Sequence, residues 1–214
     1  FDDNSKVEDI LDLMFVIDTT GSMSDELEYL KVELLDVIDR VAENYEQSLK
    51  VRLSVNFYRD LGDAYVVRSF PFSTNIASQV SNLSAQSSSG GGDRPEAVHT
   101  ALTNAIDEQD WSAEARARIM FIILDAPPHI EEQEVPVSIR NSIRKAASKG
   151  IRIIPIAASG IEKSDEFLFR AMDILTGGEY IFITDDSGIG GDHIEPTVGE
   201  YKVEYLNDLL VRTI

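Results

Sequence analysis

The stretch LMFVIDTTGS, residues 13–22, decides how this chain folds. Its first five residues are all apolar, and such a run is typical of a strand buried on both faces in a parallel sheet. Ligands of open α/β sheets bind in the crevice beyond the carboxyl ends of the strands. Asp18, Thr20 and Ser22 would present a carboxylate and two hydroxyl groups there. Such hard oxygen donors suit magnesium, calcium or manganese better than zinc or copper.

Further apolar segments alternate with stretches of helical character, which is the pattern of stacked βαβ units. These segments span residues 51–57, 119–124 and 151–157. Residues 180–183 read as a fifth parallel strand, and residues 65–68, which follow a short turn, as an antiparallel edge. The expected fold is therefore α/β, with a single doubly wound, Rossmann-like, mostly parallel sheet. The expected strand order is 3-2-1-4-5-6, with one antiparallel edge strand and helices on both faces.

Helices are expected where apolar residues recur at intervals of three and four or where end signals occur. Ser24 can cap the first helix, and Pro95 suits the first position of the second. A third helix is expected near residues 137–149, ending at Gly150, and a last one over residues 203–212. We interpret the Ser- and Gly-rich residues 84–92 as a loop of the site. Residues 185–191 lack the spacing of a calcium loop and are read as a turn.

Composition restricts the function classes. With 214 residues and 43% hydrophobic content, the chain is expected to form one domain over residues 1–214. Cysteine is absent, which excludes disulfides and thiolate chemistry. The formal net charge of −19 would repel nucleic acid and anionic lipid. No apolar run approaches the roughly 20 residues of a membrane helix, so no membrane insertion of this segment is expected.

A second acidic residue follows an apolar run at Asp125, directly after residues 119–124. In the expected strand order its strand is the neighbour of the strand that ends at Asp18, so both carboxylates should share one edge. Three glycines precede Asp93, and glycine allows a close approach of the backbone. The sequence therefore predicts three loops that converge on one cation.

These residues make the chain resemble the von Willebrand factor type A domain and its metal-ion-dependent adhesion site. The family's Asp-x-Ser-x-Ser motif matches Asp18, Thr20 and Ser22, its second acid matches Asp125, and Asp93 stands where the family has Thr. The strings YRD from residue 58, GGGDRPE from residue 90 and DAPPH from residue 125 resemble the branch with hemicentin-type A domains and many bacterial proteins.

The resemblance implies a divalent cation, for which we expect Mg²⁺, with Ca²⁺ or Mn²⁺ as alternatives. It also implies a protein partner of unknown identity, whose carboxylate would complete the coordination. By analogy the protein would be extracellular or at the cell surface, with a cytoplasmic location as the alternative.

Asp93 in place of Thr adds a charge, so Asp18, Asp93 and Asp125 would bring about three negative charges to one divalent cation. We hypothesise that Arg59 or Arg94, which are expected at the same edge, lowers this negative potential. For Arg59 an ion pair with the adjacent aspartate at position 60 is an equal alternative.

Simpler interpretations exist for several of these residues. Asp18 with Ser22, or Asp93 alone, could cap the helix that follows. His129 lies close enough to Asp125 to act as a ligand or proton carrier, although a loop histidine bonded to the backbone is the more ordinary case. The remaining histidines and the tryptophan are read as structural, namely His99, His193 and Trp111.

The function expected from these features is a metal-dependent adhesion or interaction module that is not an enzyme. A metal-dependent hydrolase or phosphotransferase is the alternative, because clustered carboxylates suffice for metal catalysis. The sequence contains no Gly-x-Ser-x-Gly, His-Glu-x-x-His, Gly-x-x-x-x-Gly-Lys or Asp-x-Asp-x-Thr motif, however. A further alternative is an A domain that works with a separate ATPase. Dinucleotide binding is disfavoured, since Gly-x-Gly-x-x-Gly is missing after the first strand.

Overall fold

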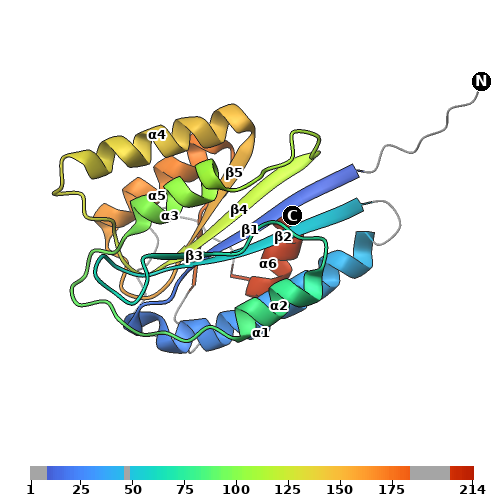
Figure 1. Cartoon of the computed structure of the whole chain (residues 1–214), viewed down its shortest axis with the longest axis horizontal. Helices are drawn as coiled ribbons and strands as arrows, with labels where there is room; N and C mark the ends of the chain where they lie inside the picture. Colours follow the sequence, from blue (N-terminus) through green and yellow to red (C-terminus); the bar gives the residue numbers. More distant parts are fainter. Residues whose placement is uncertain (1–8, 46–48, 184–202) are drawn as a thin grey trace, which may run out of the picture.

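A six-stranded sheet with the order β3-β2-β1-β4-β5-β6 forms the centre of the computed structural model (Figure 1). The structure describes residues 9–45, 49–183 and 203–214. The strands are β1 (Asp9–Asp18), β2 (Leu49–Tyr58), β3 (Val67–Ser69), β4 (Ala117–Leu124), β5 (Ile151–Ala157) and β6 (Ile181–Phe182). Among these described strands, β3 alone is antiparallel to its neighbour. The predicted fold class, strand order and antiparallel edge are confirmed.

Helices cover both faces of this sheet (Figure 1). One face carries α1 (Ser24–Tyr45), α2 (Ile76–Ser84) and α6 (Leu206–Thr213), and the other carries α3 (Val98–Thr103), α4 (Glu134–Lys149) and α5 (Lys163–Thr176). Side chains alternate between the two faces along β1. Phe15 and Ile17 therefore enter the core under α1, whereas Met14 and Val16 enter the core under α3 and α4. This double burial is the reason that residues 13–17 are apolar without interruption.

The central strands are fixed by parallel pairing and by aromatic contact. β1 lies between β2 and β4, with Asp18 opposite Tyr58 and Ile17 opposite Ile123. The rings of Phe15 and Phe121 stack with their centroids 5.3 Å apart. Because the strands are parallel, the loops that follow β1, β2 and β4 gather at one end of the sheet (Figure 1).

Several predicted elements differ from the structure. The edge strand lies two residues late, at Val67–Ser69. Ser24 is no cap, because the 3-10 turn Gly21–Met23 precedes it and Ser24 is already helical. The second helix starts at Val98 rather than at Pro95, since an isolated parallel bridge holds residue 96 in an extended loop. The predicted end of the third helix at Gly150 is confirmed, because Gly150 caps α4 with a φ of +66°.

Two helices were not predicted. The N-cap of α2 is Asn75, whose side chain accepts from the backbone of Ser78. The N-terminus of α5 carries a capping box between Glu162 and Asp165. Both are local signals that the sequence contains. The turn predicted at residues 185–191 and His193 lie outside the described residues.

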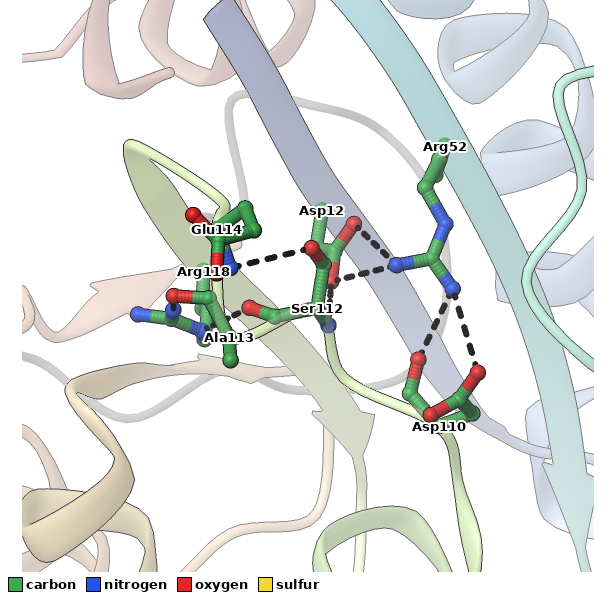
Figure 2. A network of polar contacts seen from close by, with 7 residues as sticks. All are labelled: Asp12, Arg52, Asp110, Ser112, Ala113, Glu114 and Arg118. Carbon is green, nitrogen blue, oxygen red and sulfur yellow. Dashed lines mark hydrogen bonds and ion pairs between the residues drawn. The ribbon is translucent and has the colours of Figure 1, made fainter.

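The end of the sheet opposite these loops is fixed by a polar network around Asp12 (Figure 2). Asp12 is fully buried on β1, where it accepts from the backbone N–H of Ser112 at 2.6 Å and pairs with Arg52 of β2 at 3.2 Å. Arg52 also donates to the carbonyl of Asp110 at 2.8 Å, and Arg118 donates to the carbonyl of Ser112 at 2.8 Å. The network attaches the loop before β4 to the two neighbouring strands.

Replacing Arg52 should destabilise the fold, because Asp12 would remain buried with fewer partners. We expect Arg52→Met to lower the free energy of unfolding by roughly 1–3 kcal/mol. The control is Arg116→Met, whose ion pair with Asp9 is exposed and should contribute less than about 1 kcal/mol. Urea unfolding followed by circular dichroism measures both, and equal losses would contradict a structural role of the Asp12 network.

Candidate metal centre

Asp18, Thr20 and Ser22 form one contiguous group of oxygen atoms at the end of β1. Asp18 is fully buried, and its Oδ1 accepts from the Thr20 backbone at 2.8 Å and from the Thr20 hydroxyl at 2.7 Å. The Thr20 hydroxyl lies 3.2 Å from that of Ser22. The second carboxylate oxygen, Asp18 Oδ2, is buried and has no hydrogen-bond partner. One carboxylate oxygen is therefore left for another ligand.

The same geometry shows that Asp18 and Ser22 do not serve as helix caps. The N-cap of the 3-10 turn is Thr20, which makes no side-chain capping bond. Its hydroxyl instead donates to Asp18. Asp93 does not cap the next helix either, because that helix starts at Val98 with Ala97 as its N-cap. The capping interpretation of both acids is therefore wrong.

Asp125 directly follows β4 and lies at the same edge as Asp18. It is 7% exposed, and its Oδ1 has no hydrogen-bond partner. Burial raises the pKa of Asp125 to about 6, with Glu26 adding to the shift, whereas the Ser22 hydroxyl and Arg94 lower it. Burial raises the pKa of Asp18 to about 7, and the charge of Asp125 contributes further. The two carboxylates thus oppose each other's ionisation, which a cation between them would relieve.

Residues 84–92 are the predicted loop of the site, and hydrogen bonds hold this loop against the β1 end. The carbonyl of Gly90 accepts from the backbone of Gly21 at 3.0 Å, and the N–H of Gly91 donates to Asp63 Oδ2 at 3.0 Å. Gly90 has a φ of +83°, and a Cβ atom there would lie 2.3 Å from Asp63. The positive φ favours glycine at this position, and any larger residue would also have to displace the Asp63 carboxylate.

A pocket of about 320 Å³ lies where these loops meet. It is lined by Ser22, Gly90, Gly91, Gly92, Asp93, Arg94, Glu96, Asp125, Ala126 and Gly160. Asp93 is exposed at its rim. Within the part of the chain that the structure describes, no three Asp, Glu or His side chains lie close enough to hold an ion among themselves. Asp93 therefore does not complete a three-carboxylate cluster with the two buried acids, and its role as a direct or water-mediated ligand stays a prediction.

Glu96 also lines this pocket, although no role was predicted for it from the sequence. It is 2% exposed, and its Oε2 is buried without a hydrogen-bond partner. Burial raises the pKa of Glu96 to about 9, with the charges of Asp18 and Asp60 adding to the shift. The sequence did contain a signal for this position, because Glu96 is an acidic residue directly after a proline in the glycine-rich loop of the site.

Arg94 lies at the pocket rim but is bound on its other side. It donates to Asp165 Oδ2 at 2.5 Å and to the carbonyl of Gly160 at 3.2 Å. Its positive charge lowers the pKa of Asp125. The hypothesis that Arg94 lowers the negative potential of the site requires a pKa shift in this direction.

Arg59 contacts neither of its predicted partners, the candidate ligands and Asp60. Its guanidinium lies 4.5 Å from the ring centroid of Tyr65 and donates to the carbonyl of Ser87 at 2.8 Å. Asp60 instead lies 2.6 Å from Nε2 of His129. The predicted Arg59–Asp60 ion pair is therefore absent from the structure, and the ring of His129 contacts a side chain rather than the backbone. These contacts connect the β2–β3 turn to the loop after β4.

Trp111, which was read as structural, has structural partners. The indole of Trp111 donates to the carbonyl of Ala105 at 2.8 Å, and its ring lies 4.8 Å from that of Phe72. Trp111 is thus a packing residue, as predicted. His99 is on α3, where burial lowers its pKa.

Comparison with known proteins places the chain in a family. A sequence profile of the von Willebrand factor A domain matches residues 12–185, which include all candidate ligands. The chain therefore belongs to the von Willebrand factor A domain family. Domains of this family are generally interaction modules, and many bind a divalent cation. No helix in the described ranges is long and apolar enough to cross a membrane.

Individual relatives show similarity over part of their length. A von Willebrand factor type A structure from Catenulispora acidiphila matches with a TM-score of 0.62 and 14% identity, over 84% of this chain and 40% of that chain. At this identity the match supports the fold alone. An ariadne-like RING finger protein of Acanthamoeba polyphaga mimivirus is 31% identical over 121 residues, which are 56% of this chain and 11% of the viral protein.

The glycine loop gives a first test of the site's geometry. Gly90→Ala would place a Cβ at positive φ and against the Asp63 carboxylate, so we expect a loss of roughly 1–3 kcal/mol in unfolding free energy. Gly92→Ala is the matched control, since a Cβ there meets nothing within 4 Å. Urea unfolding of both variants measures the difference. Equal stability of the two would contradict the close packing of Gly90.

The raised pKa of Asp18 gives a second test, in chelator and without metal. Between its ordinary value of 3.8 and about 7, the unfolded chain releases this proton while the folded chain keeps it, so stability falls as pH rises through that window. Asp18→Asn removes the unfavourable ionisation of this buried carboxyl group. Near pH 4, where the wild-type group is protonated in the folded chain, the variant should have about the same stability as the wild type. Near pH 8 it should be more stable by up to a few kcal/mol, at about 1.4 kcal/mol per pKa unit.

Thermal unfolding at both pH values measures the effect. The control is Asp9→Asn, which removes a half-exposed carboxylate from the same strand. A difference between Asp18→Asn and wild type that stays constant with pH would refute the shifted pKa.

Proposed function

We propose that this domain binds a divalent cation at the edge where β1 and β4 end, and that it engages a protein partner through that cation. The observation that carries the proposal is a pair of buried carboxylate oxygens, Asp18 Oδ2 and Asp125 Oδ1, that have no hydrogen-bond partner. Buried polar groups without partners are rare and destabilising. A cation at this edge would satisfy both oxygens and lower the repulsion between the two acids.

The donor set fits a hard cation. Asp18 and Asp125 would supply carboxylate oxygens, and Thr20 and Ser22 would supply hydroxyl oxygens from the turn after β1. Asp93 at the rim would add an oxygen directly or through water. Oxygen ligands of this kind suit Mg²⁺, with Ca²⁺ and Mn²⁺ as the alternatives. The bound ion would offer its open coordination position to an oxygen of the partner.

The position of the pocket supports a binding role. It is lined by residues of four loops, those after β1, α2, β4 and β5, and Asp93 and Arg94 at its rim are exposed, so a partner's side chain would have access to the ion. The chain carries a formal net charge of −19, which opposes an acidic partner at long range. The cation and Arg94 would supply local positive charge at the point of contact. We propose an interaction module rather than an enzyme, in an extracellular or cell-surface setting.

Calorimetric titration with MgCl₂, CaCl₂ and MnCl₂ tests the proposal directly. We expect saturable binding of at least one ion to the wild type, and a loss of tenfold or more in affinity for Asp18→Asn and Asp125→Asn. The matched control is Asp12→Asn, a buried carboxylate at the other end of the same strand, which should bind the ion as the wild type does. A wild type that binds none of the three ions would overturn the proposal.

A further inference from the structure

Helix α5 has apolar residues on its solvent side and acidic residues on its inner side. Phe167, Ile174 and Leu175 are 79%, 74% and 61% exposed. Glu166 and Asp173 of the same helix are only 2% and 7% exposed. A surface helix ordinarily shows the reverse, with charged residues in water and apolar residues in the core. Because exposed apolar patches mark interaction sites, the solvent side of α5 has the composition of an interface.

The acidic residues that α5 buries have partners inside the domain. Glu166 pairs with Arg170 at 2.6 Å, and Asp165 accepts from Arg94 at 2.5 Å. A rotation of α5 that buried its apolar side would break these contacts and leave the acids without partners, which is costly. The exposure of the apolar side is therefore fixed by the packing of the helix.

The exposed apolar residues form one stripe along α5. Phe167 and Ile174 are two helical turns apart, and Leu175 follows directly. Arg170 is on the border of the stripe away from α4, because its guanidinium lies 4.5 Å from the ring centroid of Tyr180, just before the edge strand β6. Leu175 is on the other border, toward α4, which packs against α5 (Figure 1).

α4 places positive charge beside this stripe. The helix carries four basic residues and one acidic residue, in a chain that has twice as many acidic as basic residues. Lys145 pairs with Asp107 at 2.7 Å, so its side of α4 faces the turn after α3. Arg140 is on the opposite side, toward α5, and Arg144 lies next to it on the outer surface. Both are exposed, and neither forms an ion pair with another described residue.

We propose that this face of the domain binds an acidic amphipathic helix of a partner protein. The α4–α5 face is defined here as Phe167, Ile174 and Leu175 together with Arg140 and Arg144. Apolar side chains of such a helix would cover the stripe, as in other helix-on-groove complexes, and its carboxylates would pair with the two guanidinium groups. The face lies beside the sheet rather than at the edge where β1 and β4 end, so this binding needs no cation and is independent of the proposed function.

Two other occupants fit this face less well. A symmetric dimer would bring the same patch from both subunits, and the patch contains no carboxylate to pair with Arg140 or Arg144. An anionic membrane would offer negative charge, but an extended surface also meets the field of a chain with a net charge of −19. A single helix meets mainly the charges within a screening length of about 8 Å, and these are the arginines of α4.

Fluorescence anisotropy with a labelled synthetic peptide tests the proposal on the full chain in chelator. The peptide is a helix of about five turns, with Leu at positions i, i+3, i+4 and i+7 and Glu beside them. We expect saturable binding to the wild type. The affinity should fall about tenfold or more for Phe167→Ser, and likewise for Arg140→Gln combined with Arg144→Gln. A peptide with Gln in place of Glu should also bind about tenfold more weakly.

Two control variants change the same residue types elsewhere. Val32→Ser removes an apolar residue that is 65% exposed on α1, on the other face of the sheet, and Arg116→Gln removes an exposed arginine. Both should bind the peptide as the wild type does. All variants should keep the wild-type melting temperature within a few degrees, because the substituted side chains are exposed or partly exposed.

Three results would overturn the proposal. The first is a wild type that does not bind the acidic peptide, or that loses no affinity in the Phe167 and arginine variants. The second is binding to phosphatidylserine vesicles that Phe167→Ser abolishes, which would assign the face to a membrane. The third is a dimer in sedimentation that Phe167→Ser converts to a monomer, which would assign the face to a second copy of the chain.

Discussion

β1 lies in parallel register between β2 and β4, with Ile17 opposite Ile123, and the site depends on this pairing. The register brings the ends of both strands to one edge of the sheet, where the charge of Asp125 acts on Asp18. Their burial then sets the chemistry. Two carboxylates in a poorly solvated place oppose ionisation, and both have raised pKa values. Burial against the apolar interior of the sheet thus makes the two negative charges unfavourable, and a bound cation would offset them.

A buried aspartate lies near each end of β1, and the two differ in their hydrogen-bond partners. Near the start of the strand, Asp12 is surrounded by an arginine and by a backbone N–H, which fix the loop before β4 (Figure 2). At the other end, Asp18 receives two hydrogen bonds on one oxygen and none on the other. The first arrangement stabilises the fold. The second leaves a coordination position open, and this incomplete satisfaction is what favours a functional interpretation of the edge.

The loops around the pocket are held by contacts with one another. Gly90 and Gly91 pack against Asp63 of the β2–β3 turn, and Asp60 of the same turn binds His129 of the loop after β4. Glu96 is attached to that loop through its backbone. Candidate ligands from different loops are thereby fixed before any ion arrives, which reduces the ordering that binding would require.

The sequence by itself determined the α/β sheet, its strand order and the group Asp18, Thr20 and Ser22, because these depend on local features. An uninterrupted apolar run marks a central strand, and the next residues along the chain are at its end. Asp125 was predictable for the same reason. The Pro95 helix start was wrong, because a bridge between distant loops overrides the local preference of proline.

Only the tertiary structure decided which other side chains face the pocket. Arg59 packs on Tyr65, the ring of His129 contacts Asp60, and Glu96 lies buried in the pocket, whereas the sequence predicted a site position for the first two and no role for Glu96. Their orientations depend on contacts between residues far apart in the sequence. Burial, and with it the pKa of each acid, arises from the packing of the whole domain, whereas the order of strands follows from the succession of apolar segments.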